Sequence, residues 1–142
     1  MRQSLQPSRD PADYQFSLRI RTRFAETDAM GVIHHAAYLT YMEETRTAFL
    51  RSIGHPYVQM RSEGLDAPVL EVAVQYRKPL NFEDEVDIHL WGGAVTRTTF
   101  QLAYLMTVEG EARATAVSVH GCVDLNGKAA RLPQWIAEAF AG

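Results

Sequence analysis

The chain has 142 residues, 46% hydrophobic and 22% charged, which is the composition of a globular protein long enough for one core. Its formal net charge of −3 excludes the global positive field that would hold nucleic acid, so we expect no nucleic-acid partner. The single cysteine, Cys122, excludes an intrachain disulfide framework and predicts a reducing, cytoplasmic setting. The sequence contains neither an apolar leader nor 18 consecutive apolar residues, so we expect neither export nor a membrane span.

The N-terminal third predicts a tail, a strand and a loop. Residues 1–13 are predicted to be a frayed tail, and residues 14–142 a single domain. From residue 16 to residue 24, a period of two predicts a half-buried strand. Its core-facing positions are Phe16, Leu18, Ile20, Thr22 and Phe24, and its solvated positions are Ser17, Arg19, Arg21 and Arg23. Residues 25–34 contain a glycine, two acids and no clean periodicity, which indicates a loop.

The next segment has helical spacing. Apolar or small residues recur every three or four positions from residue 35, namely Tyr38, Met42, Thr45, Phe49 and Ile53. Gly54 stands where a helix C-cap belongs, and Pro56 follows it. This predicts one long helix over residues 35–53. Its many apolar members indicate burial on more than one side, as for a helix held inside a curved sheet.

The second half of the chain predicts four more strands and a short helix. Alternation marks strands over 70–76, 86–90, 100–108 and 112–123. Gly92-Gly93 and Asn126-Gly127 are predicted turns, and residues 109–111 a tight hairpin. Trp135, Ile136, Ala139 and Phe140 predict a terminal amphipathic helix.

Strand, long helix and four antiparallel strands make an α+β plan without a βαβ rhythm. One helix cannot cover both faces of a five-stranded sheet. We therefore expect the uncovered face or edge to pair with another copy, as a homodimer or a homotetramer with the active site at the subunit interface.

The stretch from Arg23 to Tyr38 carries the chemistry. Asp28 lies in the predicted loop, seven residues before the first turn of a buried helix, where backbone N–H groups have no partner within the helix. A carboxylate beside such amides can attack a carbonyl carbon while the amides bind the carbonyl oxygen.

The same stretch resembles the 4-hydroxybenzoyl-CoA thioesterase-like family. The matching positions are Phe24, Glu26, Asp28, Gly31, Val32, Ile33, His35 and Tyr38, with Glu43 and Arg46 further along the helix. Residues 74–80 and 84–86 resemble the second strand and turn of that family, and the likeness covers roughly residues 16–125 in order. It implies a hotdog fold, in which a five-stranded antiparallel sheet wraps around one long central helix, and it implies hydrolysis of an acyl-CoA thioester.

The resemblance also implies roles for individual residues. Asp28 acts either as the nucleophile that forms a mixed anhydride or as the base that activates water, and both routes stay open. Backbone amides around Gly31, Val32 and His35 polarise the carbonyl, and the His35 side chain orients substrate or handles a proton. A thiol leaving group has a pKa near ~8.5, so its expulsion needs no strong general acid.

Other polar residues are weaker candidates for the site. Tyr38 and Glu43 are expected to contact substrate, and the basic residues near turns could hold the phosphates of coenzyme A, namely Arg77, Lys78, Arg97, Lys128 and Arg131. The histidines His34, His35 and His55 do not predict a metal site, because His55 lies beyond the far end of the helix. We expect no metal and no cofactor.

Two other functions fit the pattern. A 3-hydroxyacyl-thioester dehydratase would use His35 with Glu43 of a partner chain and leave Asp28 idle. A non-catalytic acyl-CoA-binding dimer would be indifferent to replacement of Asp28. The acyl group, and the choice between CoA and an acyl carrier protein, are left open by the residues.

Overall fold

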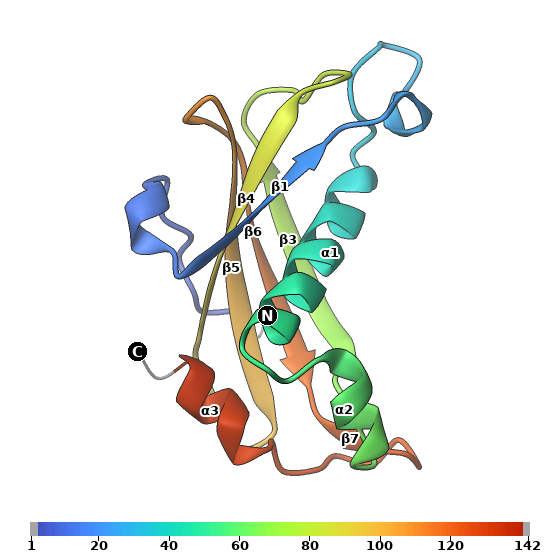
Figure 1. The fold of residues 1–142 in the computed structure, drawn as a ribbon, viewed down its shortest axis with the longest axis vertical. Coiled ribbons are helices and arrows are strands. Elements are labelled where there is room, and N and C mark those ends of the chain that lie inside the picture. The colour runs from blue at the N-terminus through green and yellow to red at the C-terminus, as the bar shows by residue number, and fades with distance from the viewer. Residues whose placement is uncertain (1–2, 141–142) are drawn as a thin grey trace.

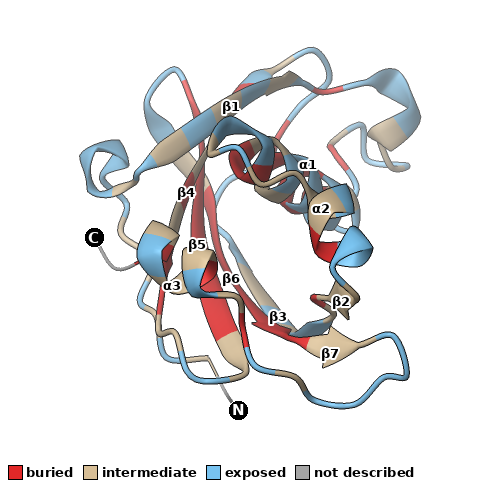
Figure 2. Ribbon diagram, turned by 60° about the horizontal axis from the view of Figure 1, so that its bottom comes forward, coloured by how far each residue is buried: buried red, intermediate tan, exposed pale blue. Residues whose placement is uncertain are grey.

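A five-stranded antiparallel sheet curls around one long helix in the computed structural model, which describes residues 3–140 (Figure 1). The strands are β1 (Phe16–Arg21), β3 (Val69–Tyr76), β4 (Glu85–Gly93), β5 (Thr99–Val108) and β6 (Glu111–Gly121), in the spatial order β1-β4-β5-β6-β3. The helix is α1 (Ala37–Ser52). Figure 2 shows α1 in the hollow of the sheet and buried residues concentrated on β4, β5 and β6. The predicted α+β plan is confirmed.

Shorter elements complete the domain. They are the 3-10 helices η1 (Pro11–Asp13) and η2 (Phe24–Glu26), the helices α2 (Tyr57–Ser62) and α3 (Gln134–Phe140), and the paired two-residue strands β2 (Leu65–Asp66) and β7 (Val123–Asp124). The predicted terminal helix is confirmed as α3. The sequence pattern did not predict α2, β2 and β7. No helix within residues 3–140 combines the length and the apolar character needed to cross a bilayer.

The first strand is shorter than predicted. Its burial alternates as expected, but β1 ends at Arg21, and Phe24 lies 74% exposed instead of in the core. The Glu26 carboxylate accepts a hydrogen bond from the Arg23 N–H at 2.9 Å, which turns the chain into η2. This local hydrogen bond therefore ends the strand, although the alternating pattern of the sequence continues to Phe24.

The long helix begins two residues later than predicted and ends where Gly54 requires. The Ala36 N–H donates to His34 Nδ1 at 3.1 Å, so residues 34–36 form a turn that precedes α1. At the other end Gly54 has φ +82°, and the His55 N–H reaches the Leu50 carbonyl at 3.0 Å. This Schellman arrangement confirms Gly54 as the helix stop.

Gly92 and Gly93 belong to β4, so their prediction as a turn was wrong. A Cβ atom on Gly92 would lie 2.0 Å from Cδ1 of Phe140, the last residue of α3. Glycine is therefore required where the ring of a distant helix packs flat on the strand, and not where the chain reverses. The reversal follows over residues 94–98.

The described part of the predicted tail lies on the outer face of the sheet. The amides of Ser4 and Leu5 donate to Gln101 Oε1 at 2.8 and 3.3 Å. The Tyr14 ring lies 6.0 Å from the His89 ring. The fraying of residues 1–13 stays a prediction, and its first two residues lie outside the described chain.

Candidate active site

The loop before α1 is folded around Asp28. The Asp28 N–H donates to the Val32 carbonyl at 2.8 Å, and the Gly31 N–H returns to the Asp28 carbonyl at 3.0 Å. Gly31 has φ +82°, a conformation that L side chains rarely adopt. The carboxylate oxygen Oδ1 accepts from the Met30 N–H at 2.8 Å and from the Val32 N–H at 3.4 Å. Within residues 3–140 no partner meets Oδ2, so one carboxylate oxygen holds the turn while the other makes no hydrogen bond.

Asp28 lines a cavity of about 350 Å³ between the loop, the start of α1 and the end of β3. Its walls include six of the residues that the sequence predicts for the site, namely Asp28, Val32, His35, Tyr38, Arg77 and Lys78. Met30, Ile33, Tyr76 and Pro79 complete the lining. Two segments that are distant in sequence, residues 28–38 and residues 76–79, therefore meet at one hollow.

The start of α1 leaves the amide of His35, a residue that lines this cavity, without a partner among residues 3–140. The N–H groups of His34 and Ala36 are occupied by the Glu26 carbonyl and by His34 Nδ1. The His35 N–H makes no hydrogen bond to any group in the described chain. The His35 carbonyl, in the next peptide group, accepts from Tyr76 Oη at 3.0 Å, which ties residue 35 to β3. A carbonyl oxygen placed in the cavity can thus accept from the His35 amide.

Glu26 ties the Asp28 loop to the helix. The buried Tyr41 hydroxyl donates to Glu26 Oε1 at 2.6 Å, and the Arg23 guanidinium donates to Oε2 at 2.9 Å. Partial burial raises the pKa of Glu26, but the hydrogen bonds from Tyr41 and Arg23 outweigh it and leave that pKa below its ordinary value. Glu26 is therefore an ionised anchor rather than a second acid for catalysis.

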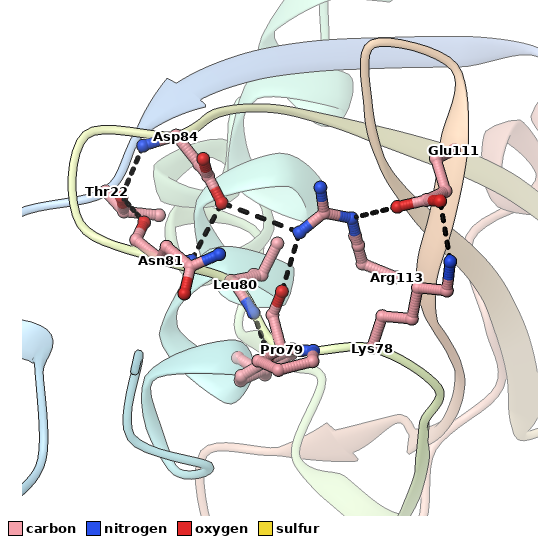
Figure 3. A network of polar contacts seen from close by, with 9 residues as sticks. Thr22, Lys78, Pro79, Leu80, Asn81, Asp84, Glu111 and Arg113 are labelled. Carbon is pink, nitrogen blue, oxygen red and sulfur yellow. Dashed lines mark hydrogen bonds and ion pairs between the residues drawn. The ribbon is translucent and has the colours of Figure 1, made fainter. Parts of the chain in front are cut away.

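The opposite wall is held by a polar network around Arg113 (Figure 3). Arg113 Nη1 donates to the Pro79 carbonyl at 2.6 Å, and its guanidinium pairs with Glu111 at 2.9 Å. Glu111 also binds Lys78 Nζ at 2.7 Å. The Leu80 N–H reaches the Tyr38 hydroxyl at 3.3 Å, which joins this wall to α1. The charge of Lys78 is thus already paired, whereas within residues 3–140 the Arg77 guanidinium donates to the neutral Gln75 side chain and meets no carboxylate.

The other predicted phosphate-binding residues lie elsewhere. Arg97 and Arg131 line a separate cavity of about 740 Å³ beside α3, at the end of the sheet opposite the Asp28 loop (Figure 1). Lys128 lies in the turn after β7, where its amide donates to Asp124 Oδ1. Arg77 and Lys78 are therefore the basic residues of this set that share a cavity with Asp28.

Glu43 lines a second cavity, of about 280 Å³, further along α1. Leu39, Met42 and Arg46 of α1, Val69 and Val72 of β3, and Tyr104, Ser118 and His120 of the central strands also line it. Arg46 Nη1 donates to His120 Nδ1 at 2.8 Å, and His120 Nε2 lies 2.7 Å from Ser118 Oγ. Burial, with a smaller contribution from the Arg46 charge, lowers the pKa of His120 to about 3.

The sequence analysis did not predict this buried network. Its signal in the sequence is the pair of polar residues, Ser118 and His120, that continue the alternate positions of β6 occupied by the buried Ala114 and Ala116. No three His, Cys, Asp or Glu side chains converge on a metal-sized site anywhere in residues 3–140. His34 and His35 stack with ring centroids 4.2 Å apart.

Comparison with known proteins places the chain in a family. The model of the Thioesterase-like superfamily matches residues 22–140. A 1,4-dihydroxy-2-naphthoyl-CoA hydrolase of Synechococcus elongatus is 30% identical over 80% of this chain and 83% of its own.

Solved structures are similar to this chain in fold. A hypothetical protein from Aquifex aeolicus superposes with a TM-score of 0.85 at 40% identity, covering 89% of this chain and 99% of its own. The DHNA-CoA thioesterase of Staphylococcus aureus superposes with a TM-score of 0.82 at 29% identity, covering 88% and 87%. The predicted hotdog fold is confirmed. The chain belongs to the thioesterase-like superfamily and is a thioester hydrolase of the hotdog fold.

Proposed function

We propose that this protein hydrolyses acyl-CoA thioesters with Asp28 as the reacting carboxylate. The observation that carries the proposal is the shared cavity, which Asp28 and His35 both line, together with the lack of a hydrogen-bond partner for Asp28 Oδ2 and the His35 N–H within residues 3–140. The names of two relatives, a dihydroxynaphthoyl-CoA hydrolase and a DHNA-CoA thioesterase, support acyl-CoA as the substrate class.

The reaction needs three actions from the site. The His35 N–H donates to the thioester carbonyl oxygen and stabilises the negative charge that develops on it. Asp28 Oδ2 attacks the carbonyl carbon, or removes a proton from a water that attacks it. The C–S bond then breaks, and the thiolate of CoA leaves. In the first route, water hydrolyses the resulting mixed anhydride and regenerates the carboxylate.

The amides of Met30 and Val32 keep the carboxylate in one orientation throughout. They bind Oδ1 and therefore direct Oδ2 away from the turn. Arg77, at the rim of the cavity, is the favoured contact for a CoA phosphate, because Lys78 is already paired with Glu111. A dehydratase is less well supported, since it would leave Asp28 idle although Asp28 lines the same cavity as His35.

Asp28→Asn tests the proposal. Asparagine keeps an oxygen that can accept the turn hydrogen bonds, but it can neither attack nor take a proton. We expect kcat for acyl-CoA hydrolysis to fall by at least about 10³-fold while KM changes much less. The release of free thiol from a panel of acyl-CoAs measures both constants.

Asp124→Asn is the matched control. Asp124 Oδ1 accepts from the amides of Asn126 and Lys128 in a turn of the same kind, far from the Asp28 cavity. This variant is expected to retain wild-type turnover. Undiminished turnover by Asp28→Asn would overturn the role of Asp28, and a wild type that releases thiol from no acyl-CoA would overturn the activity.

We also infer that two copies pair along β3. The β1 edge is protected by ion pairs of Arg19 and Arg21 with Asp87 and Glu85. The β3 edge instead exposes apolar side chains, with Val69 and Tyr76 each 50% exposed. Because Tyr76 lines the Asp28 cavity, a copy docked on this edge would close the site.

Light scattering on a sizing column tests this inference. Val69→Lys should shift the protein toward monomer, whereas Ser17→Lys on the opposite edge should leave the wild-type assembly unchanged. A wild-type mass of one chain contradicts pairing, and a mass of four chains indicates a second interface.

A further inference from the structure

The two cavities are lined by neighbouring residues of the same helix, α1, and the same edge strand, β3. Tyr38 of α1 and Tyr76 of β3 line the Asp28 cavity, and the adjacent Leu39 and the inward-facing Val72 begin the second one. Both hollows therefore lie between the same helix and the same edge strand. The second cavity is therefore the neighbouring space into which the far end of an acyl group that reacts at Asp28 could extend.

The walls and the floor of the second cavity differ in chemistry. Leu39, Met42, Val69 and Val72 make apolar walls. The floor is polar and comes from Arg46, Tyr104, Ser118 and His120. Such a hollow accepts a hydrophobic group that ends in a polar atom.

The hydrogen-bond network leaves unused donors at the floor. Arginine can only donate, so His120 Nδ1 must be its acceptor, and the ring proton is then on Nε2, facing Ser118 Oγ. Ser118 and Tyr104 share one hydrogen bond at 3.0 Å, which uses one of their two hydroxyl hydrogens. The other hydroxyl hydrogen and the remaining Arg46 N–H groups have no acceptor within hydrogen-bond distance among residues 3–140.

The positive charge of Arg46 is also incompletely paired. Its side chain is only 13% exposed, while the nearest carboxylate, Glu43, is 68% exposed and 3.9 Å away, beyond hydrogen-bond distance. A buried guanidinium beside a neutral histidine is stabilised by an oxygen acceptor from a ligand.

We propose that this second cavity selects acyl groups that carry an oxygen acceptor at their far end, with Arg46 as the specificity-determining residue and His120 as its positioning residue. Side chains of a helix tilt toward its N-terminus, so the end of the Arg46 side chain lies beside Met42, one turn earlier. Met42 is seven residues after His35. At 1.5 Å per residue, the acceptor belongs roughly 10 Å from the thioester carbon. The inference rests on the proposed acyl-CoA hydrolysis.

Three substrates of equal chain length test the proposal, namely octanoyl-CoA, 8-hydroxyoctanoyl-CoA and octanedioyl-CoA. We expect wild-type kcat/KM for octanedioyl-CoA to exceed that for octanoyl-CoA by about 10- to 150-fold, the range for one hydrogen bond to a charged group. A preference for 8-hydroxyoctanoyl-CoA as well would also support the proposal, because the floor then requires an acceptor and not a charge. Equal kcat/KM values for all three would overturn it.

Variants assign the preference to the network. In Arg46→Met the ratio of octanedioyl to octanoyl kcat/KM should fall to near one, and comparing two substrates in one variant cancels any general loss. His120→Gln keeps an acceptor for Arg46 and a donor for Ser118 and should retain most of the ratio, whereas His120→Leu should lose it. A ratio unchanged in Arg46→Met would refute the assignment. If these variants do not fold, the wild-type ratio still decides.

The outcomes separate this inference from the proposed function. A wild type that hydrolyses octanoyl-CoA without preference removes the inference and leaves the activity standing. A wild type that hydrolyses none of the three removes the activity. In that case, calorimetry with the corresponding non-hydrolysable thioethers of CoA decides, since equal affinities overturn the recognition and a tenfold preference for the carboxylate supports it.

Discussion

The buried His120 should make the stability of this protein depend on pH well above the range where carboxylates titrate. Its pKa in the folded protein is lowered to about 3, mainly by burial and further by the Arg46 charge. The same imidazole in an unfolded chain has a pKa near ~6.5. Between these values the unfolded state holds a proton that the folded state does not. The free energy of unfolding therefore falls as the pH falls from about 6.5 toward 3.

The size of this effect follows from the two pKa values. Each pH unit inside the window costs about 1.4 kcal/mol, and the cost begins only as the pH passes below 6.5. Between pH 7.0 and pH 5.0 the contribution of His120 comes to roughly 2 kcal/mol. Burial also lowers the pKa of His89. This residue and other titrating groups therefore contribute to the pH dependence of the free energy of unfolding in the wild type and in every variant that keeps them.

Urea unfolding at pH 7.0 and pH 5.0 measures this difference. His120→Gln supplies an acceptor and a donor but has no proton to gain, so it should lose about 2 kcal/mol less than the wild type over the interval. Ser118→Ala removes the partner of Nε2 but keeps the imidazole buried, and it should retain the wild-type dependence. Equal losses in the wild type and His120→Gln would show that this histidine is accessible to protons in the folded protein, contrary to its burial.

Two further substitutions follow from the packing. Gly92→Ala should lower the free energy of unfolding by about 1–3 kcal/mol, because the added Cβ meets the Phe140 ring. Gly93→Ala should lower it by less, and equal losses of the two variants in denaturant titrations would contradict the role given to that ring. Tyr41→Phe removes a hydrogen bond to the Glu26 carboxylate, so it should lower the free energy of unfolding by about 1.5–3 kcal/mol and raise the pKa of Glu26. An NMR titration measures that pKa, and an unchanged value would argue against the hydrogen bond.

Much of the fold could be predicted because it depends on local pattern. Alternation identified all five long strands, and helical spacing with Gly54 identified α1 to within two residues. The error at Gly92-Gly93 has a long-range physical cause. Gly92-Gly93 has the composition of a turn, but its conformation is decided by Phe140, 48 residues away. Contacts at that distance leave no mark in a local pattern.

The candidate site divides in the same way. Asp28, Val32 and His35 lie within eight residues, so one stretch of sequence predicts the acid, the turn that orients it and the amide beside it. The basic residues needed tertiary information. Arg77 and Lys78 reach the Asp28 cavity because β3 ends there. Arg97 and Arg131 carry the same kind of charge but lie at the other end of the sheet.

This division bears on how such a chain sets its specificity. The proposed chemistry is contained in one continuous loop and the first turn of α1, fixed to the helix by the Glu26–Tyr41 hydrogen bond. The proposed recognition of the acyl end is assembled from α1, β3, β5 and β6 by contacts as long as the 74 residues between Arg46 and His120. Both parts meet on α1, a single rigid helix, so the spacing between reacting carbon and recognised oxygen is set by helical rise. Residues at the floor can therefore change without moving Asp28, and the choice of substrate can vary while the reaction stays the same.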